Sequence, residues 1–91
     1  MLSYMLLECS PGSEKDVINQ ISSLVGVVEV NGIFGKYDIF VKVSAENPDL
    51  MESTISQIRQ IKIISSNTFP VVYGQGGTID DKMNSFQIKL N

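Results

Sequence analysis

Apolar residues recur along the chain with two different periods, which separate the predicted strands from the predicted helices. Ile39, Val41 and Val43 fall on one face of an extended stretch, with Phe40 and Lys42 on the other, as in a strand with one buried face. Three further stretches are also strand-like, namely residues 2–9, 27–30 and 63–73. The pattern therefore predicts four strands.

Apolar residues spaced three and four positions apart predict two helices, each with one apolar stripe. The stripe of the first helix consists of Val17, Ile18, Ile21, Leu24 and Val25, and that of the second of Leu50, Met51, Ile55, Ile58 and Ile61. Ser13 is a suitable N-cap for the first helix, and Gly26 is expected to end it as a left-handed cap. Asn47 followed by Pro48 predicts the start of the second helix.

A hairpin between the second and third strands carries the first candidate binding residues. Asn31, Gly32 and Gly35 supply the conformational freedom of a tight reversal, with Tyr37 and Asp38 near its mouth. The glycine lets a ligand approach the backbone, the carboxylate can pair with an amine, and the phenol can cover the ligand. Alternatively, Tyr37 is an interface aromatic and Asp38 is a strand-edge charge that prevents aggregation.

The order strand, helix, strand, strand, helix, strand predicts an α+β fold of the ferredoxin-like βαββαβ type. Such a chain forms a four-stranded antiparallel sheet with both helices on one face. The other face is left bare and should carry Phe40. An exposed apolar sheet face predicts an interface, most simply a two-fold dimer. The alternative is a monomer with a curved, solvated sheet.

The character of the chain changes after Tyr73, which divides it into a domain over residues 1–73 and an extension over residues 74–91. Residues 74–77 are glycine-rich and predict a flexible linker, whereas Phe86, Ile88 and Leu90 alternate like a strand. We expect the end of the extension to dock as an extra strand on a sheet edge, more readily on a neighbouring subunit than on its own. A frayed terminus is the alternative.

Length and composition narrow the class of protein. The 91 residues fit one small domain, and the 43% hydrophobic content includes no run of about 20 apolar residues. A soluble protein is therefore expected, without a membrane partner. The single Cys9 and the lack of signal-peptide features favour a cytoplasmic location. The net charge of −3 and the scattered lysines argue against direct binding to nucleic acid.

Little in the chain points to catalysis. It contains no histidine, and the Asp80-Asp81 pair lacks the further oxygen ligands of a calcium loop, so no metal or cofactor is expected. Ser66 and Thr68 share one face of the last predicted strand and could donate hydrogen bonds to a ligand, or simply pack against neighbouring strands. Without a nucleophile–base pair, we do not expect an enzyme.

Several of these segments together resemble the effector-binding domain, or RAM domain, of the Lrp/AsnC transcription regulators. The resemblance covers residues 2–73 and is carried by Pro11-Gly12, Gly26-Val27, Gly35-Lys36-Tyr37-Asp38 and Ser66-Asn67-Thr68. It implies a ferredoxin-like domain that forms a dimeric α/β-barrel-like sandwich through the open sheet face. It also implies higher assemblies with an amino acid bound between dimers. Gly35, Tyr37 and Asp38 would line that pocket, with Ser66 and Thr68 opposite.

The chain departs from the family pattern at three places. The first strand begins at Leu2, where a helix-turn-helix would precede it, so we expect a stand-alone sensor domain. The turn over residues 61–63 lacks the usual glycine and is a residue shorter. Pro70 lies within the last predicted strand, where it should mark an edge or a bulge.

The expected function is therefore a non-enzymatic, amino acid-sensing module in transcriptional control. It would act through its assembly state or through full-length Lrp/AsnC regulators. Two alternatives remain open. One is a structural co-assembly module without a ligand. The other is a small dimeric ferredoxin-like oxygenase or isomerase, against which the missing histidine argues.

Overall fold

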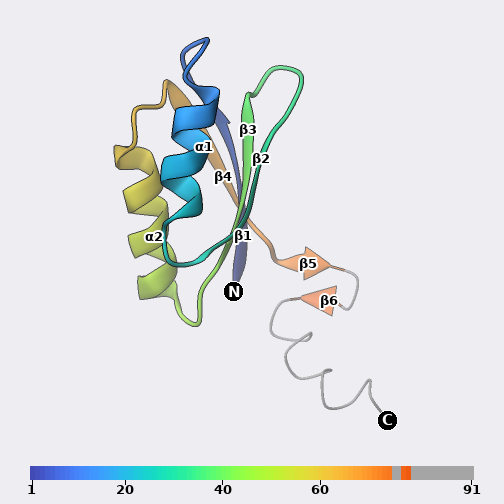
Figure 1. Cartoon of the computed structure of the whole chain (residues 1–91). Coiled ribbons are helices and arrows are strands. Elements are labelled where there is room, and N and C mark those ends of the chain that lie inside the picture. The colour runs from blue at the N-terminus through green and yellow to red at the C-terminus, as the bar shows by residue number, and fades with distance from the viewer. Residues whose placement is uncertain (75–76, 79–91) are drawn as a thin grey trace.

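A four-stranded antiparallel sheet with two helices on one face forms the main part of the structure (Figure 1). In this computed structural model, residues 1–74 and 77–78 are described. The sheet has the strand order β2-β3-β1-β4. Its elements are β1 (Leu2–Glu8), α1 (Glu14–Ser22), β2 (Val27–Gly32), β3 (Ile39–Ser44), α2 (Pro48–Gln60) and β4 (Ser65–Pro70). The predicted ferredoxin-like α+β fold is confirmed.

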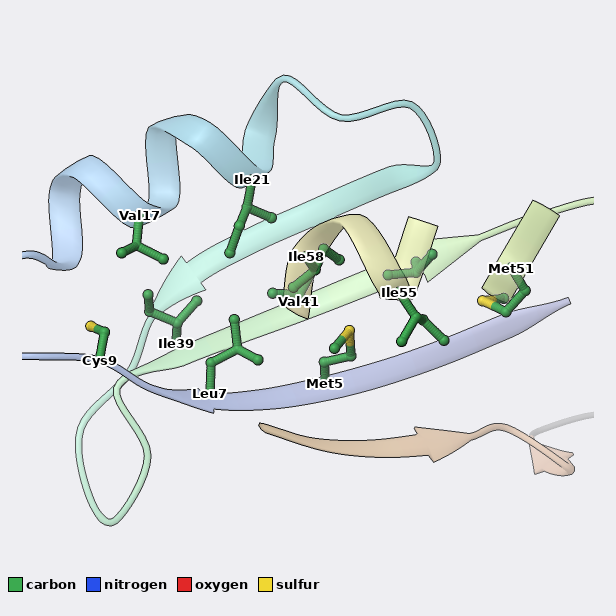
Figure 2. Close-up of a cluster of buried hydrophobic side chains, with 11 residues drawn as sticks. Met5, Leu7, Cys9, Val17, Ile21, Ile39, Val41, Met51, Ile55 and Ile58 are labelled. Atoms are coloured by element: carbon green, nitrogen blue, oxygen red, sulfur yellow. The ribbon is translucent and has the colours of Figure 1, made fainter. Parts of the chain in front are cut away.

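The core lies between the sheet and the helices, and strand alternation decides which side chains enter it. Met5 and Leu7 of β1 are fully buried, whereas Tyr4 and Leu6, which alternate with them, are half-buried on the other face. The central strand β3 contributes three fully buried residues, Ile39, Val41 and Val43. The helices close the core with Val17 and Ile21 of α1 and with Met51, Ile55 and Ile58 of α2 (Figure 2). Each such side chain contributes about 1.5–3 kcal/mol on burial.

Helix α2 begins as the sequence predicts. Its N-cap Asn47 accepts a hydrogen bond from the Leu50 amide through Oδ1 at 2.9 Å, and Pro48 is the first helical residue. Leu50, however, is exposed and does not belong to the buried stripe. It lies about 100° around the helix from the buried Met51. The buried face instead includes Thr54, whose hydroxyl donates a hydrogen bond to the Val25 carbonyl at 3.0 Å.

Helix α1 ends earlier than predicted, at Ser22 rather than beside Gly26. The following residues, which include the exposed Val25, form the loop to β2. Gly26 does adopt the expected positive φ, 98°, but it does so within this loop. Ser13 is the N-cap residue of α1 as predicted, but it forms no side-chain capping hydrogen bond, because its hydroxyl donates to the carbonyl of Ser10 at 2.6 Å. Tertiary packing of the loop against α2 therefore sets the end of α1.

Strand β4 is shorter than the predicted stretch over residues 63–73 and lies at the edge of the sheet. Pro70 is its last residue and stands opposite Ser3 of β1. A proline cannot donate to a ladder, so its position at the end of an edge strand agrees with the sequence prediction. The position of β4 at the sheet edge thus accommodates Pro70, which a central strand would exclude.

Beyond Val72, two short strands pair antiparallel, β5 (Tyr73–Gly74) and β6 (Gly77–Thr78). The sequence predicts a flexible linker over residues 74–77, and of these Gly74 pairs with Gly77. The strand predicted near residues 85–90 lies outside the described residues. Its docking on a sheet edge stays a prediction.

We expect Gly26→Ala to destabilise the domain more than Gly12→Ala. Both glycines have positive φ values, 98° and 90°, so alanine adds backbone strain of about 1–3 kcal/mol at either position. Only at Gly26 would the new Cβ also lie 2.8 Å from Thr54 Oγ1, whereas nothing lies within 4 Å at Gly12. Overpacking of this kind costs about 1–3 kcal/mol more. Urea denaturation of the two variants measures the difference, and equal losses would contradict the role given to Gly26.

Candidate functional site

The loop over residues 33–38 joins β2 to β3 and carries three of the predicted binding residues. One hydrogen bond joins the two ends of the loop, from the Ile33 amide to the Asp38 carbonyl at 2.9 Å. Gly35 has a φ of 134° and is exposed, and a Cβ placed there would meet nothing within 4 Å. Asn31 and Gly32, which the sequence assigns to the reversal, belong instead to β2. Gly35 alone therefore provides the left-handed backbone of the turn.

Asp38 is fixed by the end of β1 through both its backbone and its side chain. Its amide donates to the Leu7 carbonyl at 2.8 Å, and its Oδ2 accepts a hydrogen bond from the Cys9 amide at 2.9 Å. The residue is half-buried. Among the described residues, Oδ1 accepts no hydrogen bond, so one carboxylate oxygen remains available to a cationic group. One oxygen of the Asp38 carboxylate therefore has a structural contact, and the other has no partner among the described residues.

Tyr37 is held against the edge strand of the sheet. Its hydroxyl oxygen accepts a hydrogen bond from Asn67 Nδ2, and Lys36 Nζ lies 5.7 Å from its ring centroid, within the range of a cation–π contact. Asn67 is a residue of the site that the sequence analysis did not single out. Strand alternation could have indicated Asn67, because it places this residue on the opposite face of the sheet from Ser66 and Thr68.

Ser66 and Thr68 lie on the helix-covered face of the sheet. They stand opposite Leu7 and Met5, which are fully buried in the core. The Thr68 hydroxyl oxygen accepts a hydrogen bond from Arg59 Nη2 at 3.2 Å. The structure therefore brings Gly35, Tyr37 and Asp38 together in one chain but does not bring Ser66 and Thr68 to them. A pocket that contains all five residues stays a prediction.

The open face of the sheet carries a cluster of apolar side chains among polar ones, which by strand alternation include Glu29, Lys42 and Asn67. Phe40 lies on it, half-buried, with its ring centroid 5.4 Å from that of Tyr4 and the two planes tilted by 41°. The strand registers place Leu6 beside Phe40, and Phe69 beside Tyr4. Phe69 is 49% exposed. These four side chains, Tyr4, Leu6, Phe40 and Phe69, are called the open-face patch below.

The described residues hold no cluster of three or more histidine, cysteine, aspartate or glutamate side chains that could bind a metal ion. Cys9 is buried as a free thiol. In the same part of the chain, neither helix has the length and apolar character needed to cross a bilayer. The groups that the loop brings together are one carboxylate, one phenol and one exposed glycine.

Together, the fold and the loop define a small ferredoxin-like domain with a hairpin loop at one end of its sheet, in which Lys36 and Asp38 accompany the exposed Ile33 and Phe34. A family model described as the Lrp/AsnC ligand binding domain matches residues 3–73. The chain belongs to this family.

Two solved structures illustrate the likeness in fold. AsnC of E. coli is 26% identical, with a TM-score of 0.72 over 81% of this chain and 52% of that chain. A hypothetical protein of Pyrococcus horikoshii is 24% identical, with a TM-score of 0.71 over 75% of this chain and 84% of that one. The second likeness shows the fold alone.

Two curated relatives are longer proteins. An uncharacterised HTH-type transcriptional regulator of Pyrococcus furiosus is 34% identical over 64 residues, which are 66% of this chain and 43% of the regulator. A homocitrate synthase of Sulfurisphaera tokodaii is 41% identical over 56 residues, which are 62% of this chain and 12% of the synthase. The chain therefore spans less than half the length of either relative.

We expect the Tyr37–Asn67 hydrogen bond to couple the loop to β4. Tyr37→Phe and Asn67→Ala should each lower the free energy of unfolding by about 0.5–1.5 kcal/mol. The double variant should lose little more than either single variant, because both remove the same contact. Gln20→Ala, which removes a hydrogen bond to Asp16 on the exposed surface of α1, is the control. Additive losses in urea denaturation would show that the two side chains do not interact in solution.

Proposed function

We propose that this chain is a non-enzymatic regulatory domain that binds an amino acid or a similar amine-bearing metabolite at the loop over residues 33–38. The observation that supports this most is the geometry of Asp38, with Oδ2 held by the Cys9 amide and no described partner on Oδ1. A fixed carboxylate with one open oxygen suits an ammonium group. The family match to a ligand binding domain supports the same class of function.

The loop is already ordered around this carboxylate. The Tyr37 hydroxyl is held by Asn67, so the ring needs little reorganisation to cover a ligand. At Gly35 the absence of a side chain leaves the backbone open to close approach. Binding to a preorganised loop loses less conformational entropy than binding to a flexible one. These features support the loop as the effector site, with Ser66 and Thr68 still proposed as further contacts.

The proposed signal passes through assembly. The open-face patch would be covered in a two-fold dimer, because a cluster of aromatic and aliphatic side chains on a sheet face favours self-association. An effector bound between such dimers favours whichever assembly completes its pocket, by the difference in its affinity for the two states. The homodimer, the higher oligomer and the action through full-length Lrp/AsnC regulators belong to this proposal, as does a cytoplasmic setting.

The names of the two curated relatives suggest two readouts of such binding. One is a transcriptional regulator and the other is an enzyme, so a domain of this kind accompanies both classes of protein. We propose transcriptional control for this chain, since AsnC of E. coli and the regulator of Pyrococcus furiosus both point that way. A regulatory role without chemistry of its own fits both.

A second candidate function is structural co-assembly without a ligand. The hydrogen bond between Asp38 and the Cys9 amide favours this function, because it gives the carboxylate a structural role that requires no ligand. The two functions differ in whether Asp38 Oδ1 pairs with the cationic group of a ligand.

Asp38→Asn separates these two functions. Asparagine keeps an oxygen that can accept from the Cys9 amide but removes the negative charge. We expect the fold to persist and the affinity for the effector to fall about ten- to a hundredfold, since a charge-assisted hydrogen bond contributes about 1.5–3 kcal/mol. Thermal unfolding against a panel of amino acids identifies the effector, because a ligand at about a hundred times its Kd adds about 2.7 kcal/mol. Calorimetry then compares the variants.

Asp16→Asn on the exposed surface of α1 is the matched control and should leave the affinity unchanged. If no amino acid raises the melting temperature, or if the folded Asp38→Asn protein binds as tightly as the unchanged chain, effector binding at this loop is refuted. Structural co-assembly then becomes the better account.

Phe40→Asp should weaken or abolish the dimer. Burial of a phenylalanine contributes about 1.5–3 kcal/mol, and each dimer would lose two such side chains and gain two buried charges. Val25→Asp, at an 89% exposed position in the loop after α1, is the control and should leave association intact. Sedimentation velocity at micromolar concentration gives the mass of each. A folded, monomeric unchanged chain would rule out the dimer.

A further inference from the structure

A hollow of about 700 Å³ lies on the helix side of the sheet and takes no part in the loop site, since none of residues 33–38 lines it. It is bounded by the start of β1, by α2, and by the end of β4 with the segment that follows. Met51 and Ile55 of α2 form an apolar wall, and both are 6% exposed. This hollow between α2 and β4 is called the α2–β4 hollow.

One buried polar group opens into the α2–β4 hollow without a partner. Ser3 lines it and is only 2% exposed, yet its hydroxyl forms no hydrogen bond with any described residue. In the same part of the chain, every fully enclosed polar side-chain atom does have a partner. The Ser3 oxygen is therefore not fully enclosed, and the hollow is what it faces. Buried hydroxyls are nearly always hydrogen-bonded in native proteins, so this group indicates a place for a polar ligand atom.

The charged groups of the hollow are separated by sign. Arg59 lies near the end of α2 and reaches Thr68 with one guanidinium nitrogen at 3.2 Å, which leaves most of its five donors unused by that contact. Glu52 lies seven positions earlier on the same helix, about 10.5 Å along its axis. Glu46, just before α2, lines the hollow at this acidic end. All three charged side chains are exposed and form the rim.

The Ser3 hydroxyl belongs to the acidic end. The start of β1 pairs with the end of β3, with Leu2 opposite Ser44, two residues before Glu46. Thr68 belongs to the basic end, where its hydroxyl oxygen accepts from Arg59 and its own proton remains available to an acceptor. Along α2, Ile55 lies between Glu52 and Arg59, and Met51 directly precedes Glu52. The hollow thus offers donors at one end, acceptors at the other, and an aliphatic surface between them.

We propose that the α2–β4 hollow is a second binding site, for an unbranched aliphatic molecule that carries a carboxylate at one end and an ammonium group at the other. The carboxylate accepts hydrogen bonds from Arg59 and from the Thr68 hydroxyl. The methylene chain packs on Met51 and Ile55. The ammonium group donates to Ser3 Oγ and pairs with Glu52, with Glu46 adding to the negative potential there. This site is independent of the effector site proposed at the loop.

The test uses ε-aminocaproate as the probe, with caproate and hexylamine as analogues that each lack one of its charges. Amide chemical shifts in the ¹⁵N–¹H spectrum of the full chain are followed during titration with each compound. We expect saturable shifts at the start of β1, along α2 and at the end of β4, with ε-aminocaproate binding about tenfold more tightly than either analogue. Equal binding of the three compounds, or no saturable shift around the hollow, would overturn the proposal.

Variants then test the two ends separately. Arg59→Gln and Glu52→Gln should each weaken ε-aminocaproate about tenfold, and Ser3→Ala should weaken it several-fold. Lys62→Gln, an exposed cation outside the hollow, should have no effect. Unchanged affinity in a folded Arg59→Gln protein would refute the site. Asp38→Asn should leave this binding intact, so the two proposed sites can fail independently.

Two further outcomes would also refute the site. One is binding that shifts the loop over residues 33–38 and disappears in Asp38→Asn, which would place the probe at the other site. The second is a set of shifts around the hollow that follows protein concentration rather than probe concentration. That result would mean that a second copy of the chain covers the hollow.

Discussion

The register of β1 between β3 and β4 is the constraint on which the rest of the structure depends. It sets Met5 opposite Val41 and Thr68, and Leu7 opposite Ile39 and Ser66. Because side chains alternate between the two faces, a slip of one residue would move the core of β1 to the open face and the open-face patch into the core. The Asp38 contacts to Leu7 and Cys9 end the β1–β3 ladder. The carboxylate proposed to bind an effector therefore also holds the chain at the end of this ladder.

The structural contact of Asp38 and its proposed role in binding use different oxygens of the same carboxylate. The Cys9 amide is the donor at the point where β1 leaves the sheet, and without Oδ2 it would lose a part-buried partner. A cation on Oδ1 would compete for the charge of the same carboxylate but would not displace the amide. Loop binding and sheet ordering are thus compatible, and each keeps the carboxylate in one orientation. This is how a residue on a loop can be as precisely placed as one in a strand.

Much of the fold follows from local sequence signals, and the parts that do not are decided by contacts between distant residues. The alternation in β3 and the capping of α2 by Asn47 are local, so the element order and the bare sheet face were predictable. The end of α1 was not. Leu24 and Val25 continue the helical spacing, but the helix ends at Ser22. In the loop that follows, Gly26 lies beside Thr54, a residue far along the chain.

The site was predictable to a similar extent. Gly35, Tyr37 and Asp38 are neighbours in sequence, so a turn suffices to bring them together. Asn67 meets Tyr37 only because the β1–β4 register places it there, and no local pattern encodes that register. The α2–β4 hollow could not be predicted from the sequence for the same reason. Its groups come from the start of β1, from α2 and from β4, three segments that no sequence pattern relates.

Strand β4 connects the loop with the α2–β4 hollow. On one of its faces Asn67 holds Tyr37, and on the other the next residue, Thr68, holds Arg59. As an edge strand, β4 is paired on one side only in the described sheet, so fewer backbone hydrogen bonds resist its displacement than resist that of β1. Any shift of β4 would change both side-chain contacts together. A ligand at one site can alter affinity at the other only if it distinguishes two positions of this strand, and by linkage the effect would then be reciprocal.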